Sequence, residues 1–156
     1  MTSVVIWSLI TVVSLLDIPV MTRNLLVFCC AAPLLPLSFL IGKILKVDIF
    51  SKDNPLSGLG LLFTLNQLLY LLIVMWVYRA VPEKMVMVYA MVFGAHLFPY
   101  SWLYKSKAYM GFAIAIPIIS LILGILYSGL AVAITLTMIE LVFVLILFRE
   151  LKQMRQ

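Results

Sequence analysis

The stretch Met85–Lys107, MVMVYAMVFGAHLFPYSWLYKSK, determines how the rest of the chain is interpreted. Its apolar run is long enough to cross a bilayer, which requires about 20 apolar residues in a helix. Charged residues bracket the run, with Glu83 and Lys84 before it and Lys105 near its end. The stretch also carries the only histidine of the chain, His96. An imidazole inside an apolar span predicts a functional position, because burying it without a partner is costly.

The composition of the whole chain predicts that lipid is its solvent. Of its 156 residues, 65% are hydrophobic and 11% are charged, whereas a soluble domain is nearer half apolar and a quarter charged. The 11 basic residues outnumber the 6 acidic ones. They stand between apolar blocks, where basic residues orient membrane spans, and they form no nucleic-acid-binding stripe. We therefore expect the lipid bilayer as a partner and no nucleic acid.

Six apolar stretches predict an all-α bundle of transmembrane helices, built as one integral membrane domain over residues 1–156. The predicted spans are residues 2–20, 24–42, 58–78, 85–104, 108–127 and 129–148. The first is the weakest because Asp17 interrupts it, so five spans are the alternative. Pro33 and Pro36 predict a kink or a break in the second span, since each removes a helix hydrogen bond. Residues 43–57 form the longest predicted loop, which is expected at the membrane interface.

The distribution of lysine and arginine predicts the orientation of the bundle. With six spans, one side of the membrane holds most of the basic residues: Lys43, Lys46, Lys52, Lys105, Lys107, Arg149, Lys152 and Arg155. The other side holds Arg23, Arg79 and Lys84. Basic residues favour the cytoplasmic side of a membrane, so both termini are predicted to lie in the cytoplasm.

Few strongly polar side chains lie inside the predicted spans. At ~1.5 Å per residue, Asn66 lies ~12 Å from the inner end of its span. His96 and Glu140 each lie ~17 Å from the outer ends of theirs. In a hydrocarbon core of about 30 Å, these depths nearly coincide, slightly inside the midplane. Tyr100 shares a helix face with His96, one turn away. The sequence therefore predicts a binding site at this depth, formed by Asn66, Gln67, His96, Tyr100 and Glu140.

Two functions fit such a cluster. Glu140 could exchange a proton with His96 in a proton- or cation-coupled carrier, in which Gln67 also lines the site for a small polar or cationic solute. Alternatively, the polar residues only bridge helices, contributing under about 1 kcal/mol each, in a non-transporting interaction or immunity-type protein. A membrane enzyme ranks third, because the sequence contains neither HExxH nor GxSxG. One histidine with one glutamate is insufficient for a metal site, and no cofactor is expected.

Smaller features of the sequence predict packing. Gly94 and Gly111 each stand four residues from an alanine, a spacing that suits close approach between helices. Asp17 lies near the predicted outer boundary of the membrane, where it could pair with Arg23. Six short helices could also form a homo-oligomer.

Three stretches carry a resemblance to a known family: VFGAHLFPYSWLYKSKAYMGFAIAIPIISLILG (92–124), NPLSGLGLLFTLNQ (54–67) and VPEKMVMVYAMVFGAHL (81–97). The segment HLFPYSWLYKSK is the most specific of them. From about Val13 to its tail, the chain resembles a family of small multi-span proteins from Bacillus and related bacteria, known only as a domain of unknown function. The resemblance implies a multi-pass protein of the bacterial inner membrane and assigns no activity, cofactor or catalytic residue. Members of that family begin with a further polar segment, which implies that the first span is incomplete at its cytoplasmic end.

Overall fold

The computed structural model describes residues 1–33, 40, 43, 44 and 57–154. Within these ranges the chain forms helices joined by short turns and contains no β-strand. The elements are α1 (Thr2–Ser14), α2 (Val20–Ala31), α4 (Ser57–Ala80), the 3₁₀ turn η1 (Pro82–Lys84), α5 (Met85–Leu103), α6 (Lys107–Leu126) and α7 (Gly129–Met154). The prediction of an all-α fold is confirmed.

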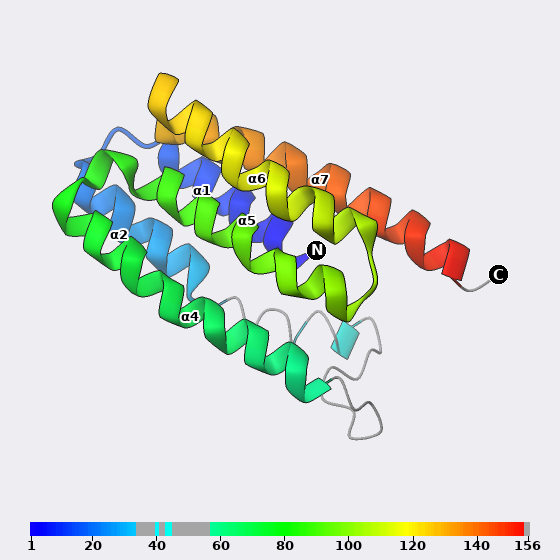
Figure 1. Cartoon of the computed structure of the whole chain (residues 1–156). Helices are drawn as coiled ribbons and strands as arrows, with labels where there is room; N and C mark the ends of the chain where they lie inside the picture. Colours follow the sequence, from blue (N-terminus) through cyan, green and yellow to red (C-terminus); the bar gives the residue numbers. More distant parts are fainter. Residues whose placement is uncertain (34–39, 41–42, 45–56, 155–156) are drawn as a thin grey trace.

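The helices form a bundle in which successive described helices run in alternating directions (Figure 1). α5 packs against α4, α6 and α7, whereas α1 packs against α7 and α2. The first and last helices of the chain are therefore neighbours. The buried face of α5 supplies much of the core, with Met85, Val86, Tyr89, Ala90, Phe93 and Leu97.

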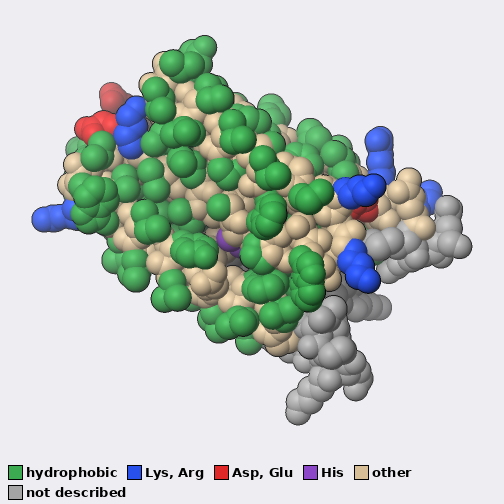
Figure 2. Space-filling view, in the orientation of Figure 1, with side chains coloured by type: hydrophobic (Ala, Val, Ile, Leu, Met, Phe, Trp, Pro, Cys, Tyr) green, Lys and Arg blue, Asp and Glu red, His purple; other side chains and the backbone are tan. Residues whose placement is uncertain are grey.

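Four described segments are long and apolar enough to cross a membrane: Gly58–Ala80, Pro82–Leu103, Lys107–Leu126 and Gly129–Gln153. α1 and α2 are also apolar but are shorter, at 13 and 12 residues. Figure 2 shows charged side chains gathered at two ends of the molecule, with a band of hydrophobic side chains between them. This length, apolarity and surface are those of a polytopic membrane bundle.

The helix boundaries in the first part of the chain differ from the predicted spans 2–20 and 24–42. α1 already ends at Ser14, and α2 begins at Val20 after a turn. Pro19 explains the break, because a proline disfavours the helical conformation of the residue before it. Pro19 itself is extended, with φ −52° and ψ 138°, and it directly precedes the first turn of α2. Pro36 and most of the predicted loop 43–57 lie outside the described residues.

The two ends of α6 are held by charged side chains from other parts of the chain. At its start, Glu150 of α7 accepts hydrogen bonds from the Ser106 hydroxyl at 2.5 Å and from the Ala108 backbone N–H at 3.1 Å. At its other end, the Lys84 ammonium donates to the carbonyl oxygen of Gly124 at 2.6 Å. A carboxylate at a helix N-terminus and a cation at its C-terminus both suit the helix dipole.

α5 and α6 approach each other closely at Gly94. A Cβ atom placed on Gly94 would lie 2.6 Å from both Ile116 Cγ2 and Pro117 Cδ, which is closer than real contacts allow. The close approach predicted at Gly94 is therefore present. The same prediction was wrong for Gly111, which has no heavy atom within 4 Å of the equivalent position. Gly111 lies on the exposed side of α6, away from α5.

These two glycines provide a matched test of the α5–α6 contact. We expect Gly94→Ala to lower the free energy of unfolding by about 1–3 kcal/mol, because the new methyl group overpacks the interface. Gly111→Ala should leave stability unchanged or raise it by up to about 1 kcal/mol, through better helix propensity. Reversible unfolding in mixed detergent micelles, followed by circular dichroism, measures both. Equal stability of the two variants would contradict the packing described.

Candidate functional site

Glu140 is a buried carboxylate near the middle of α7. It is 1% exposed and faces α1, where the Ser3 hydroxyl donates to Oε2 at 2.5 Å. Its second oxygen, Oε1, is buried and has no hydrogen-bond partner. The N-terminal amino group also interacts electrostatically with this carboxylate. A buried polar atom without a partner destabilises the fold by about 1–3 kcal/mol, so this arrangement needs a reason.

Hydroxyl groups continue from Glu140 along the contact between α1 and α7. The Thr11 and Thr137 hydroxyls lie 3.0 Å apart across this contact. Ser14, at the end of α1, is buried, and its hydroxyl donates to the Ile10 carbonyl. We call the row Ser3, Thr11, Ser14, Thr137 and Glu140 the polar seam. Along α1 it extends over 11 residue steps, or ~16 Å.

Trp7 lies between Ser3 and Thr11 in α1. Its side chain is fully buried and packs against Tyr89 and Phe93, with ring centroids 5.5 and 5.6 Å away. The indole Nε1–H has no hydrogen-bond partner. A second buried polar atom without a partner is therefore carried by α1, on the side chain that packs against α5.

Tyr100, another predicted site residue, belongs to the contact between α5 and α4, and the predicted site residue His96 lies one turn before it on α5. The Tyr100 hydroxyl donates to the Gly60 carbonyl at 3.0 Å and lies 2.6 Å from the Thr64 hydroxyl. The His96 ring packs on Tyr100, and its Nδ1 is hydrogen-bonded to the carbonyl oxygen of Phe93 in its own helix. Both of these partners of the imidazole belong to α5.

Asn66 and Gln67 complete the predicted set on α4. Gln67 is 5% exposed, whereas the amide of half-buried Asn66 donates to the Tyr70 hydroxyl of the same helix at 2.9 Å. Four of the five predicted residues thus lie on α4 and α5, whereas Glu140 lies at the contact between α1 and α7. No hydrogen bond or ring contact between described residues joins His96 to Glu140. Their similar depth did not reveal that they face different neighbours.

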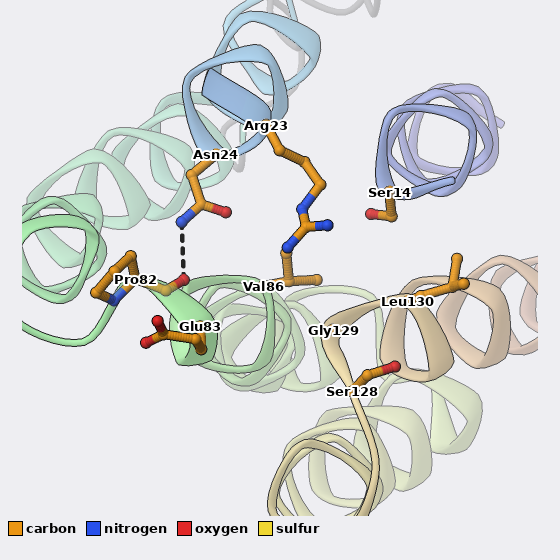
Figure 3. Close-up of a pocket in the computed structure, with 9 residues that line it drawn as sticks. All are labelled: Ser14, Arg23, Asn24, Pro82, Glu83, Val86, Ser128, Gly129 and Leu130. Carbon is orange, nitrogen blue, oxygen red and sulfur yellow. Dashed lines mark hydrogen bonds between the residues drawn. The ribbon is translucent and has the colours of Figure 1, made fainter. Parts of the chain in front are cut away.

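A polar pocket of about 260 Å³ lies at the end of the bundle where α2, α5 and α7 begin (Figure 3). Arg23 of α2 extends into it, and buried Asn24 donates to the Pro82 carbonyl at 2.8 Å. Ser14 and Ser128 also line it, so the polar seam reaches this pocket.

The predicted pairing of Asp17 with Arg23 was wrong, since no ion pair joins these two described residues. Figure 3 shows the Arg23 side chain directed into the pocket.

A spacing pattern in the sequence indicates the α1 part of the polar seam, which was not among the predicted site residues. Ser3, Trp7, Thr11 and Ser14 are spaced by four, four and three residues, which places them on one helix face. Single hydroxyls are common in apolar helices, so each alone was uninformative.

Among the described residues, no cluster of three or more His, Cys, Asp or Glu side chains could hold a metal ion.

A double-mutant cycle tests the hydrogen bond at the centre of the polar seam. Thr11→Val and Thr137→Val keep side-chain shape and remove the hydroxyls, and we expect a coupling energy of about 0.6 kcal/mol in unfolding experiments. Thr135→Val, on the same helix and without a described hydrogen bond to Thr11, is the control and should show no coupling to Thr11→Val. Strictly additive effects of the first pair would show that the two hydroxyls do not interact.

A comparison with known protein families gives a match over most of the chain. The match begins at residue 1, whereas the resemblance found in the sequence began at about Val13. The matching family model is described as "Family of unknown function (DUF7010)" and covers residues 1–150. No curated protein and no solved structure matches the chain. Because the family model covers nearly the whole sequence, the chain belongs to this family of unknown function, DUF7010.

Proposed function

We propose that this protein is a proton-coupled carrier of a small solute in the bacterial inner membrane, and that Glu140 takes up and releases the proton. The observation that supports this proposal is the state of the Glu140 side chain, which is 1% exposed with one oxygen unpaired. A charged carboxylate is costly inside an apolar bundle, whereas its protonated form is less so. Ionisable groups in such positions are typical of proton relays.

The polar seam supplies groups that can pass a proton between Glu140 and the pocket. Hydroxyls both donate and accept hydrogen bonds, and the Thr11–Thr137 distance of 3.0 Å permits transfer between them. From Ser3 to Thr11 the seam covers eight residue steps of α1, or ~12 Å, which is too far for one hydrogen bond. In our proposal, water beside the unpaired Trp7 Nε1 completes this section.

His96 has no direct part in this proposal, which differs in that respect from the sequence-based hypothesis. Its Nδ1 is bonded to the Phe93 carbonyl, and its ring packs on Tyr100. With these contacts, the imidazole stabilises the α4–α5 side of the bundle through Tyr100, whose hydroxyl reaches Gly60.

The second candidate function is that of a non-transporting interaction protein. The observation that favours it is that two polar contacts of the seam, Ser3–Glu140 and Thr11–Thr137, also hold α1 on α7. Such contacts stabilise membrane helices modestly without any transport. In that case Glu140 serves only to fix the position of α1.

Glu140→Gln separates the two candidates. The amide keeps the size of the side chain, and its oxygen can still accept the Ser3 hydrogen bond, but it cannot exchange a proton. We expect proteoliposomes with a pH-sensitive dye inside to show proton flux for the wild type and none for Glu140→Gln under an imposed pH gradient. Glu150→Gln is the matched control, because Glu150 is a carboxylate of the same helix whose two oxygens are both hydrogen-bonded. It should retain flux.

His96→Leu should also retain flux, whereas the sequence-based hypothesis predicts its loss. Flux in folded Glu140→Gln equal to that of the wild type would exclude Glu140 as the proton site. Absence of flux in the wild type, combined with a lower stability of Ser3→Ala, would favour the interaction protein.

A further inference from the structure

We infer that the polar pocket binds a small oxyanion, such as the carboxylate of a short organic acid, through the guanidinium group of Arg23. This inference does not rest on proton exchange at Glu140. The volume of about 260 Å³ is well above the ~30 Å³ share of one water molecule. It lies just below the 300–1,000 Å³ range of pockets for drug-sized molecules, which suits a small ligand.

Arg23 provides the positive charge of the pocket. Its side chain is half-buried and extends from α2 toward the space between Ser14 and Val86 (Figure 3). No ion pair joins it to a described carboxylate, and in Figure 3 the Glu83 side chain points away from it. A guanidinium group that is partly withdrawn from water and lacks a carboxylate partner has donors suited to a planar oxyanion.

The first turn of α7 lies at the same pocket. Ser128, Gly129 and Leu130 line it, and α7 is 26 residues long. The first N–H groups of a helix have no partner within the helix, and the helix dipole favours a negative charge there. The Ser128 oxygen accepts from the Ala131 N–H at 3.4 Å, which leaves its own proton available for donation to a ligand. These donors and Arg23 approach the pocket from two different helices.

Two contacts hold these groups in place. Asn24, which follows Arg23 and is 1% exposed, fixes α2 to η1 through its hydrogen bond to the Pro82 carbonyl. A Cβ atom on Gly129 would lie 3.2 Å from Val86 Cβ, so the first turn of α7 packs tightly on α5. The pocket is therefore organised before any ligand arrives, which lowers the entropic cost of binding.

Glu83 also lines the pocket and opposes an anion. Its side chain is exposed, so solvent and salt screen its charge more than that of half-buried Arg23. The two side chains consequently predict opposite effects on anion binding, which provides a test within a single pocket.

Chemical modification of arginine tests the inference on the whole protein. Phenylglyoxal reacts with accessible guanidinium groups, and mass spectrometry of the digested protein gives the rate at each arginine. We expect acetate or inorganic phosphate, at ten times its Kd and at constant ionic strength set with chloride, to slow modification of Arg23 about tenfold by mass action. Arg79, which is exposed, is the internal control and should react at an unchanged rate. Comparing the Kd of acetate with that of phosphate, each obtained from the concentration dependence of this protection, identifies which oxyanion is preferred.

Two variants complete the test. In thermal unfolding scans, Arg23→Gln should lose the stabilisation by the anion, whereas Glu83→Gln should keep or increase it. Modification of Arg23 at the same rate with and without each anion, or equal stabilisation of Arg23→Gln and wild type, would overturn the inference. Glu140→Gln should still show protection of Arg23, so a failed flux experiment and a failed binding experiment are distinguishable.

Discussion

The close packing of α5 on α6 is the contact on which the arrangement of the bundle depends. Between helices in lipid, van der Waals packing replaces the hydrophobic effect as the main attraction, and small residues permit it. Gly94 admits Ile116 and Pro117 at this contact, and charged side chains fix both ends of α6. With α6 held on one side, α5 presents its remaining faces to α4 and α7. The α4–α5 contact in turn places the Tyr100 hydroxyl at the Gly60 carbonyl.

Much of the fold could be predicted from the sequence, because length and apolarity decide whether a helix can cross a bilayer. The four longest helices lie within a few residues of their predicted spans, except that α7 continues to Met154. The break at Pro19 was missed because hydropathy is averaged over many residues, and this average hides a single residue that ends a helix. The pocket could not be predicted, since it combines the end of α1, the start of α2, η1 and the start of α7.

The predicted site illustrates a related difficulty. Counting residues along a span gives the depth of a side chain, and that is how Glu140 and His96 were grouped. Depth does not specify which neighbouring helix a given helix face contacts. That contact depends on residues that are far apart in the sequence. Glu140 meets Ser3 of α1, whereas His96 packs on Tyr100 beside α4. The number of hydrogen bonds that a carboxylate of α7 accepts depends on the same packing. Both oxygens of Glu150 are hydrogen-bonded, whereas only one oxygen of Glu140 is.

The hydrogen bond from Asn24 to the Pro82 carbonyl has a thermodynamic consequence for the whole bundle. It connects α2, which carries Arg23, to the turn from which the central helix α5 starts. A displacement of α2 at the pocket therefore changes the position from which α5 enters the core. Coupling is reciprocal, so the free energy by which a ligand at Arg23 would stabilise the packing of α5 equals the free energy by which that packing would favour the ligand. This hydrogen bond thus connects the end of the bundle that carries Arg23 with the start of its central helix.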